Sequence, residues 1–295
     1  MNGVVIIDKP SGMTSHDVVN RVRRILGQRS VGHLGTLDPL ATGVLPVVLG
    51  NLTRLAQFYA HSEKAYEGVI RFGFATDTYD ADGEPTTTPQ EVTLDGGALR
   101  TVASKFQGLI QQMPPPFSAK KIAGVPAYKL ARKKQDVELK AVEVEIKEFE
   151  ILDTTADRAT FRAHVTSGTY IRSIAHEMGR ALGYGAHLAS LRRTAVSEFS
   201  IADAHTLEAL QTAAQQGTAL SLLVHPRKLV PQLPSVTASE DSAAFIRSGR
   251  SANLPEMSRA PQVKVFYGQS ELIAIATRIA GTLFHPGIVF TGSGE

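Results

Sequence analysis

The sequence predicts an α+β fold, with a small β-rich domain at the C-terminal end of its 295 residues. Two observations lead to this prediction. Helical and strand periodicities are interleaved irregularly, without the strand–helix–strand rhythm of a parallel sheet. Near residue 230 the chain becomes rich in proline (Pro226, Pro231 and Pro234), and the segment beyond it contains alternating strands joined by a short turn. We therefore expect one domain over 1–230 and a second over 231–295.

The N-terminal segment contains the clearest local signals. A short strand is expected over 4–7. Thr14 and Asp17 have the spacing of a capping box, and the helix that they begin carries apolar residues at helical spacing until Gly27 ends it. The stretch 31–46 fits neither period, since it is apolar and contains three glycines and two prolines. It is predicted to be an ordered, largely buried loop.

Later elements follow from periodicity and from proline or glycine boundaries. Tyr66, Ile70 and Phe72 share one face of an expected strand. Thr169 is the expected N-cap of a helix with an apolar stripe. In chain order, the sequence predicts a helix over 52–60, a strand over 64–74, a polar loop over 77–89, a helix near 98–106, an extended proline segment at 114–116, strands around 142–146 and 161–165, a helix after 169, a helix over 240–248, and strands over 263–267, 272–276 and 288–290.

Composition excludes several classes of protein. With 43% hydrophobic and 20% charged residues, the chain is neither intrinsically disordered nor fibrous. The absence of cysteine excludes disulfides, iron–sulfur clusters, thiolate zinc sites and cysteine nucleophiles. No segment approaches the roughly 18 consecutive apolar residues that span a bilayer, and the N-terminal segment does not resemble a secretory signal. We expect a cytoplasmic protein that contacts no membrane.

The formal net charge is +3, and the basic residues are clustered. Clusters of this kind are typical of a surface that follows a phosphate backbone, but also of scattered solvated charges, and the residues alone leave both interpretations open. The clusters are Arg21, Arg23, Arg24 and Arg29; Lys120, Lys121, Lys129, Arg132, Lys133 and Lys134; Arg192 and Arg193; and Arg227 and Lys228.

Several motifs of known chemistry are incomplete in this sequence. His176 and Glu177 would begin a zinc-protease motif, but Arg180 stands where the second histidine is required. Asp80 and Asp82 resemble part of a calcium loop that lacks its final acid. Neither a phosphate-binding loop, a dinucleotide-binding fingerprint nor a serine nucleophile elbow occurs. Metal, nucleoside triphosphate and serine-hydrolase chemistry therefore have no support.

One carboxylate and one guanidinium lie where they are unfavourable for stability. Asp38 lies in the apolar stretch, held extended by Pro39, where an unpaired acid is costly to bury. Arg172 lies in the first turn of the helix expected after Thr169, where the helix dipole disfavours a positive charge. An Asp38–Arg172 pair would resolve both conflicts and keep the carboxylate ionised. Such a pair could serve function or structure alone, and the two residues could also be exposed and unrelated.

The stretch Gly32-His33-Leu34-Gly35-Thr36-Leu37-Asp38-Pro39-Leu40-Ala41-Thr42-Gly43 resembles the signature of the bacterial tRNA pseudouridine-55 synthases, the TruB family. Further motifs similar to those of this family occur in the same order, and together they cover about residues 3–230. They are Asp8-Lys9-Pro10-x-Gly12-x-Thr14-Ser15, Lys64-x-Tyr66, Ala75-Thr76-Asp77-Thr78-x-Asp80, Pro114-Pro115-x-Phe117-Ser118-Ala119-x-Lys121, Ser167-Gly168-Thr169-Tyr170-Ile171-Arg172 and Leu191-Arg192-Arg193.

The resemblance implies a pseudouridine synthase catalytic domain with a mixed, largely antiparallel sheet flanked by helices, followed by a PUA-like RNA-binding domain. The implied reaction converts uridine 55 in the T loop of tRNA to pseudouridine after the base has been flipped out. It requires no cofactor and no metal. The implied partner is the T arm of tRNA, without an obligatory protein partner, and the basic clusters are expected to contact the RNA backbone. We expect a monomer.

The resemblance also implies roles for individual residues. Asp38 is the implied catalytic carboxylate, oriented by Arg172; attack on the sugar, attack on the base and proton removal from the sugar all stay open as routes. Tyr66 is implied to stack on the target base and to assist proton removal from carbon 5. Substrate-binding roles are implied for four more residues: His33, in the space that the flipped base leaves; Leu191, packed near that base; and Lys9 and Lys121, where contact with phosphate and support of the fold are both open.

Three other functions remain to be distinguished from this one. A non-catalytic protein that binds or folds tRNA could use the same scaffold, although the presence of Asp38, Tyr66 and Arg172 argues against it. A guide-RNA-dependent synthase would modify ribosomal RNA with accessory proteins. The short N-terminal segment, the segment 77–141 and the modest C-terminal domain fit the stand-alone bacterial type better. A glycosidase-like enzyme would need a second carboxylate, and no convincing candidate occurs.

Overall fold

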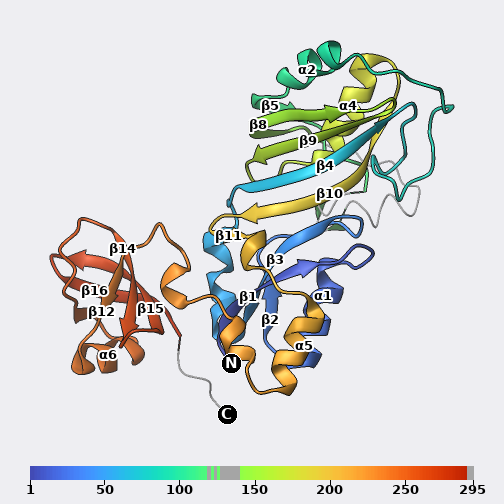
Figure 1. Ribbon diagram of the computed structural model, residues 1–295. Helices are drawn as coiled ribbons and strands as arrows, with labels where there is room; N and C mark the ends of the chain where they lie inside the picture. Colours follow the sequence, from blue (N-terminus) through green and yellow to red (C-terminus); the bar gives the residue numbers. More distant parts are fainter. Residues whose placement is uncertain (118–120, 123–124, 127–139, 291–295) are drawn as a thin grey trace.

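The computed structural model describes residues 1–117, 121–122, 125–126 and 140–290, and a large sheet forms its centre (Figure 1). In order, the strands are β1 (Gly3–Lys9), β3 (Thr42–Leu49), β10 (Ala186–Val196), β4 (Lys64–Phe72), β9 (Arg158–Val165), β8 (Val142–Thr154) and β5 (Gly108–Gln112), with β2 (Val31–His33) on β3 and β11 (Phe199–Ser200) on β10. Neighbouring strands are antiparallel except β3 and β10, which are parallel. The expected α+β fold with a mixed, largely antiparallel sheet is confirmed.

Helices flank this sheet, with α1 and α5 near one end and α2 and α4 near the other (Figure 1). None of the described helices is long and apolar enough to cross a membrane. The helices are α1 (Ser15–Leu26), α2 (Gly96–Ser104), α4 (Ile171–Leu182) and α5 (Leu207–Gln215), and the 3-10 helices are η1 (Gly50–Tyr59), η2 (Ile201–Asp203), η3 (Ala219–Leu222) and η4 (Pro226–Lys228). The short strands β6 (Lys121–Ile122) and β7 (Val125–Pro126) pair only with each other in the described part.

The parallel pairing of β3 with β10 depends on a glycine. Gly43 lies opposite Arg193 in this register and has a φ of 99°, which favours glycine. A Cβ atom at Gly43 would lie 2.2 Å from the Arg193 carbonyl oxygen. Any side chain here would therefore force the two central strands apart.

The helix predicted from the capping box is confirmed. The Thr14 hydroxyl accepts from the Asp17 N–H at 3.1 Å, and the Asp17 carboxylate accepts from the Thr14 N–H at 2.9 Å. Gly27 ends α1 in the left-handed conformation, with a φ of 58°. The helix predicted over 52–60 is instead the 3-10 helix η1, which begins at Gly50.

Thr169 is not the N-cap of α4, contrary to the prediction. Tyr170 occupies that position and makes no side-chain capping hydrogen bond. The Thr169 hydroxyl donates to the Thr166 carbonyl at 3.0 Å, so it is turned back toward the preceding strand. The helix itself, with its buried face of Ile174 and Met178, lies where the periodicity placed it.

Residues 31–46 are not a single loop, because β2 and most of β3 lie within them. Both faces of β3 are covered, so its residues Val44 and Leu45 are each 0% exposed. A strand buried on both faces lacks polar alternation, which is why the period of two is missing from the sequence. Strand β10 was also not predicted, since register shifts between 188 and 190 and between 193 and 195 interrupt its alternation.

A second sheet lies C-terminal to η4. Its order is β12 (Ser235–Thr237), β14 (Gln262–Tyr267), β15 (Glu271–Ala280), β16 (Leu283–Val289) and β13 (Ala252–Asn253), and α6 (Glu240–Arg247) packs against it. The helix and the three strands expected in this region are present. β14 and β15 form the expected hairpin, with Gly268 at a φ of 63° in its turn.

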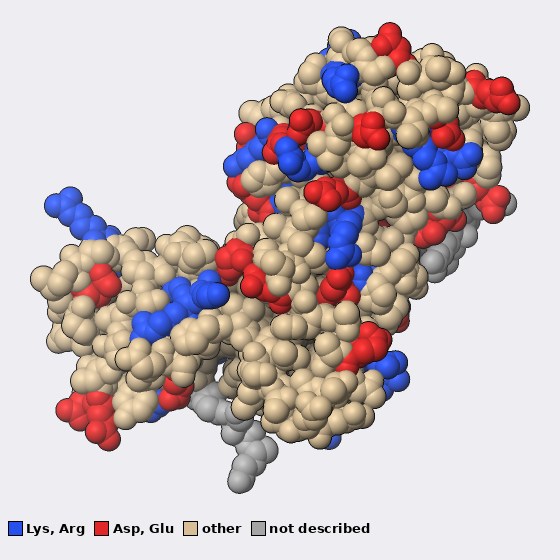
Figure 2. All heavy atoms as spheres, viewed as in Figure 1, with Lys and Arg blue, Asp and Glu red and all other residues tan. Residues whose placement is uncertain are grey.

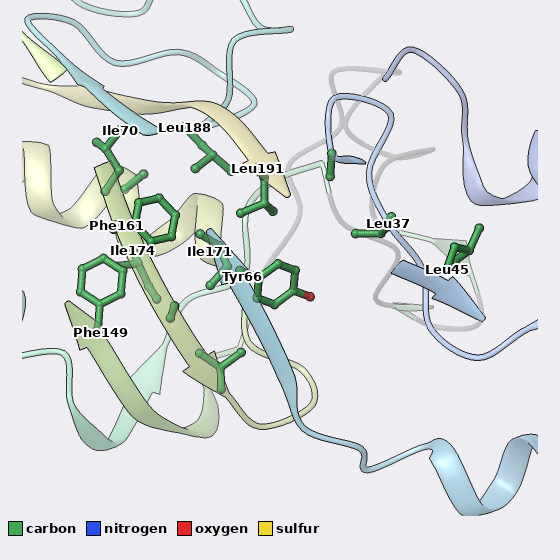
Figure 3. Packing of buried hydrophobic residues seen from close by; sticks show 14 of the residues in the cluster. Leu37, Leu45, Tyr66, Ile70, Phe149, Phe161, Ile171, Ile174, Leu188 and Leu191 are labelled. Carbon is green, nitrogen blue, oxygen red and sulfur yellow. The ribbon is translucent and has the colours of Figure 1, made fainter. Parts of the chain in front are cut away.

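Separate hydrophobic clusters cover the two faces of the large sheet. On one face, Phe149 and Phe161 pack with the α4 residue Ile174 (Figure 3). On the other, a cluster continues from β1, β3 and η1 into the C-terminal sheet, where it includes Phe266 and Ile288. The C-terminal sheet is therefore attached through a shared apolar core and not only through the connecting chain.

The chain between the two sheets is fixed by buried polar groups. The Lys264 ammonium on β14 is buried and donates to the carbonyls of Arg227 at 2.9 Å and Leu229 at 2.7 Å. Val230 has a φ of 51°, which is unfavourable for a β-branched residue. Its N–H donates to the Tyr59 hydroxyl at 2.9 Å, and burial raises the pKa of Tyr59. These contacts hold a strained connection in one conformation.

Substitution Lys264→Met is expected to loosen the connection. It leaves two buried carbonyls without donors, and at about 1–3 kcal/mol for each group we expect the free energy of unfolding to fall by about 2–4 kcal/mol. Limited proteolysis should then cut between η4 and β12 earlier than in the wild type. Lys228→Met removes a charge from η4 itself and is the matched control. Equal protease sensitivity of the two variants would contradict the assignment.

Candidate active site

The loop 34–41, which carries Asp38, is tied to the start of α1. The Ser15 hydroxyl donates to the Leu37 carbonyl at 3.0 Å and accepts from the Leu37 N–H at 2.8 Å. The Gly12 N–H donates to the Pro39 carbonyl at 2.9 Å. These bonds satisfy the backbone on both sides of Asp38 and leave little freedom to the loop.

Lys9 supports the same loop from inside. Its side chain is 0% exposed, and its ammonium group donates to the carbonyls of Pro10, Met13 and Pro39 at 2.8, 2.6 and 3.2 Å. Burial lowers the pKa of Lys9 to about 8, against the opposing effect of the Asp38 carboxylate. The substrate-binding role implied for Lys9 is corrected, because an ammonium group enclosed by the fold is not available to a phosphate.

Arg193 on β10 is a second buried cation at this loop. It is 0% exposed, and its Nε, Nη1 and Nη2 atoms donate to the carbonyls of Val44, Thr36 and Gly35 at 2.8, 3.1 and 3.0 Å. Burial lowers the pKa of Arg193, and the neighbouring Tyr66 side chain opposes that shift. The sequence placed Arg193 only in a basic cluster and gave no sign of this role.

The ion pair predicted between Asp38 and Arg172 is present. Arg172 Nε lies 2.9 Å from Asp38 Oδ2, although the contact lacks the alignment of a hydrogen bond. The Arg172 guanidinium is fixed by the carbonyls of Thr78 at 2.9 Å and Phe117 at 3.0 Å. The Arg172 side chain is 7% exposed and that of Asp38 is 41% exposed. The carboxylate is thus accessible while its cation is enclosed.

A second carboxylate, Asp80, contacts the same guanidinium. Asp80 Oδ2 lies 3.5 Å from Arg172 Nη1, and the Thr78 hydroxyl donates to Asp80 Oδ1 at 2.5 Å. Burial raises the pKa of Asp80, and both hydroxyl and guanidinium oppose that shift. The preceding residue, Tyr79, has a φ of 65° and stacks on His176 of α4 at 3.8 Å between ring centroids. The sequence showed Asp80 only as part of a family motif and a failed calcium loop.

Tyr66 and Leu191 lie on the face of the large sheet that the loop covers. In the antiparallel register, Tyr66 of β4 lies opposite Arg193, and Leu191 lies opposite Gly68. Tyr66 and Leu191 are 7% and 8% exposed. Figure 3 shows the Tyr66 ring directed from β4 toward the side on which Leu37 lies. The structure thus brings Asp38, Arg172, Tyr66 and Leu191 to one region.

Two further predicted residues have different outcomes. His33 lies on β2, next to the loop, and burial together with the Arg193 charge lowers the pKa of His33, which favours the neutral imidazole. The backbone of Lys121 lies in β6, but its side chain and all of 118–120, 123–124 and 127–139 lie outside the described part. Most of the basic cluster at 120–134 lies there too.

The described surface carries both signs of charge. Figure 2 shows basic and acidic side chains interspersed on the face in view, without one continuous basic area. Of the expected basic clusters, the pair on β10 has partners within the protein. Arg192 forms a bidentate pair with Asp8, at 3.1 and 2.8 Å, and Arg193 is buried.

The arrangement suits chemistry by a single carboxylate. An accessible carboxylate against an enclosed cation can act as a nucleophile or a base. Tyr66 supplies an aromatic face and a hydroxyl, and Leu191 supplies an apolar contact. Among the residues that the structure describes, no group of three His, Asp or Glu side chains could hold a metal ion.

Two family models match most of the chain. Residues 23–171 match the N-terminal domain of TruB family pseudouridylate synthases, and residues 172–228 match the C-terminal domain of tRNA pseudouridylate synthase B. The tRNA pseudouridine synthase B of Solibacter usitatus is 48% identical over 292 residues, which cover 98% of this chain and 100% of that protein. This chain belongs to the TruB family. The TruB family protein of Azoarcus with the same name is 37% identical, over 100% of this chain and 97% of that protein.

Two solved structures are similar to nearly the whole chain, including the C-terminal sheet. A chain of the archaeal box H/ACA sRNP Nop10-Cbf5 complex has a TM-score of 0.70 and 26% identity, covering 98% of this chain and 86% of that chain. A chain of an H/ACA RNP bound to a substrate RNA containing 2′-deoxyuridine has a TM-score of 0.71 and 25% identity, covering 98% and 85%. As a TruB family member, this chain is an isomerase that forms pseudouridine in tRNA.

Substitution Asp80→Asn is expected to lower kcat by roughly 100-fold, because the Arg172 guanidinium loses the charge that holds it in place beside Asp38. The amide can still accept from the Thr78 hydroxyl, so the loop should stay folded. Single-turnover kinetics measures the effect on the chemical step, and filter binding measures the Kd for tRNA. We expect the Kd to be unchanged. Asp82→Asn alters an exposed neighbouring carboxylate and is the control. Activity retained in Asp80→Asn would show that Asp38 needs no such support.

The buried ammonium group of Lys9 predicts a pH dependence of stability. Its pKa is about 8 in the folded protein against an ordinary 10.5, so the unfolded chain binds more protons between these values. Stability therefore rises with pH across this window. Relative to Lys9→Met, the free energy of unfolding of the wild type should increase by up to about 2 kcal/mol from about pH 8 to pH 10, at about 1.4 kcal/mol per pKa unit. Urea unfolding at several pH values measures it, and a constant difference would refute the prediction.

Proposed function

We propose that this enzyme converts uridine 55 in the T loop of tRNA to pseudouridine, with Asp38 as the essential carboxylate. The proposal rests chiefly on one observation. Asp38 is the accessible member of an ion pair whose other member, Arg172, is enclosed and fixed by two carbonyls. A carboxylate held in this way has a fixed place beside its counter-ion and can still reach a substrate.

The proposed reaction needs only the groups at this site. The bond between N1 of uracil and C1′ of the ribose breaks, and a bond between C5 and C1′ forms. C5 loses a proton and N1 gains one, so substrate and product are isomers, and no electrons are exchanged with a cofactor. Asp38 attacks the sugar, attacks the base or removes a sugar proton, while Arg172 orients it.

The target base must leave the folded T loop to reach Asp38, at a cost of a few kcal/mol. We propose that Tyr66 stacks on the flipped base and assists proton removal from C5, with Leu191 packed against it. His33, beside the catalytic loop, takes the space that the base leaves. Its neutral state suits a role in packing more than a role in binding phosphate. Lys121 is proposed to contact the substrate.

We further propose that residues 1–230 form the catalytic domain and residues 231–295 a PUA-like RNA-binding domain. The T arm of tRNA is the proposed partner, bound by a cytoplasmic monomer without an obligatory protein partner. The structurally similar chains come from RNA–protein complexes, one of them with a substrate RNA. The sequence relatives named tRNA pseudouridine synthase B favour tRNA as the substrate here.

Tritium release from a tRNA transcript labelled at C5 of uracil tests the proposal. The wild type should release tritium from a transcript with uridine at position 55 and not from one with cytidine there. Asp38→Asn should bind tRNA with the wild-type Kd and release at least about 1000-fold more slowly, since it lacks the reacting group. Asp82→Asn is the carboxylate control.

Equal release by the wild type and Asp38→Asn would place the chemistry on another residue. Tight binding without release by the wild type would instead identify a tRNA-binding protein on a synthase scaffold. Tritium release from the cytidine-55 transcript would show that the enzyme modifies a uridine at another position.

A further inference from the structure

We infer that Arg193 is a positioning residue for Tyr66, and that its guanidinium is the counter-ion for negative charge on the Tyr66 oxygen during the reaction. This inference rests on the proposed function and extends it to a residue outside the Asp38–Arg172 pair. Arg193 is among the largest fully buried side chains of the protein. A cation in such a place needs a reason, because burial of a charge without a partner is costly.

Within the described part of the chain, Arg193 has no direct anionic partner. Its guanidinium donates to three carbonyls and interacts with the Tyr66 hydroxyl. No carboxylate of the described residues forms an ion pair with it. Asp38 acts on it only through the longer-range charge. Arg193 therefore brings to the site a buried positive charge that no carboxylate of the described residues pairs with directly.

The register of the sheet places the Arg193 charge next to Tyr66. Arg193 of β10 lies directly opposite Tyr66 of β4 in the antiparallel pairing. Residues opposed in this way have Cβ atoms about 5 Å apart and their side chains on the same face. The guanidinium can only donate and the Tyr66 oxygen can accept, so the interaction of the Arg193 charge with Tyr66 is favourable. The interaction becomes stronger when the Tyr66 oxygen carries a negative charge.

The two proton transfers of the proposed reaction explain why a cation would be placed next to Tyr66. N1 of the detached uracil gains a proton, and C5 loses one after its bond to C1′ has formed. We assign both transfers to the Tyr66 hydroxyl, which donates its proton to N1 and later takes the proton from C5, while the C–H electron pair restores the ring. Between the two transfers the Tyr66 oxygen carries a negative charge. A buried guanidinium that three carbonyls already hold opposite Tyr66 stabilises this charge with little reorganisation.

The arrangement also differs from that of Lys9, the other buried cation at the loop. The Lys9 ammonium donates to backbone carbonyls alone, and Asp17 and Asp38 are the acids nearest to its charge. Both cations hold the loop, but of the two only Arg193 lies opposite Tyr66 in the sheet and interacts with it electrostatically. Lys9 is therefore the matched control for a role in loop support.

A double-mutant cycle with Tyr66→Phe tests the inference. In the wild-type background, Arg193→Lys keeps the charge but not the geometry and should lower the single-turnover rate about 10- to 100-fold, with an unchanged Kd for tRNA. In the Tyr66→Phe background the same substitution should lower the residual rate less than about 3-fold, because the group that it serves is absent. Lys9→Met should lower the rate by the same factor in both backgrounds.

An equal effect of Arg193→Lys in the two backgrounds would overturn the inference and leave Arg193 as support for the loop. Chemical rescue gives a second measurement that does not depend on Arg193→Lys folding. Added guanidinium at millimolar concentration should raise the rate of Arg193→Ala and leave Arg193→Ala/Tyr66→Phe unchanged. If Arg193→Ala folds only with guanidinium and both variants then react equally, the role is structural and the inference fails. If the wild-type enzyme released no tritium, the proposed function itself would be refuted.

Discussion

The guanidinium of Arg172 is the contact on which the site depends. It joins Asp38 of the loop, the Thr78 carbonyl and Asp80 of a second loop, and the Phe117 carbonyl of a third, all from the first turn of α4. A planar donor with five N–H groups can hold so many partners in fixed directions, whereas an ammonium group cannot. The helix dipole opposes the charge at this position, and two carboxylates compensate for it. The position of Arg172 in the first turn of α4 is unfavourable for the helix, and its contacts with the site account for it.

Much of this site could be predicted from the sequence, because two residues conflicted with their local surroundings. Asp38 in an apolar stretch and Arg172 at a helix N-terminus each needed a partner, and the ion pair is present. The capping box of α1, the strand of Tyr66 and the C-terminal hairpin were also predictable, since each is specified within a few residues. The roles of Asp38 and Tyr66 in catalysis come from the family resemblance and stay proposals.

What could not be predicted depends on contacts between distant segments. Strand β3 is buried on both faces and β10 has two register shifts, so neither alternates. The role of Asp80 depends on its contact with Arg172, which α4 brings to it. Lys9 and Arg193 are indistinguishable from surface charges in the sequence, because only the folded sheet buries them. Burial of a charged residue is a property of the assembled fold, whereas sequence patterns report local periodicity.

The order of the large sheet also governs when the enzyme becomes active during its synthesis. Strand β10, at residues 186–196, lies between β3 and β4, which are complete by residue 72. The ribosome must therefore release more than a hundred further residues before the two halves of the sheet can be joined. Until then neither Arg172 nor Arg193 can reach the loop. A chain that ends before β10 thus has no assembled active site, and the edges of β3 and β4 that β10 covers stay unpaired.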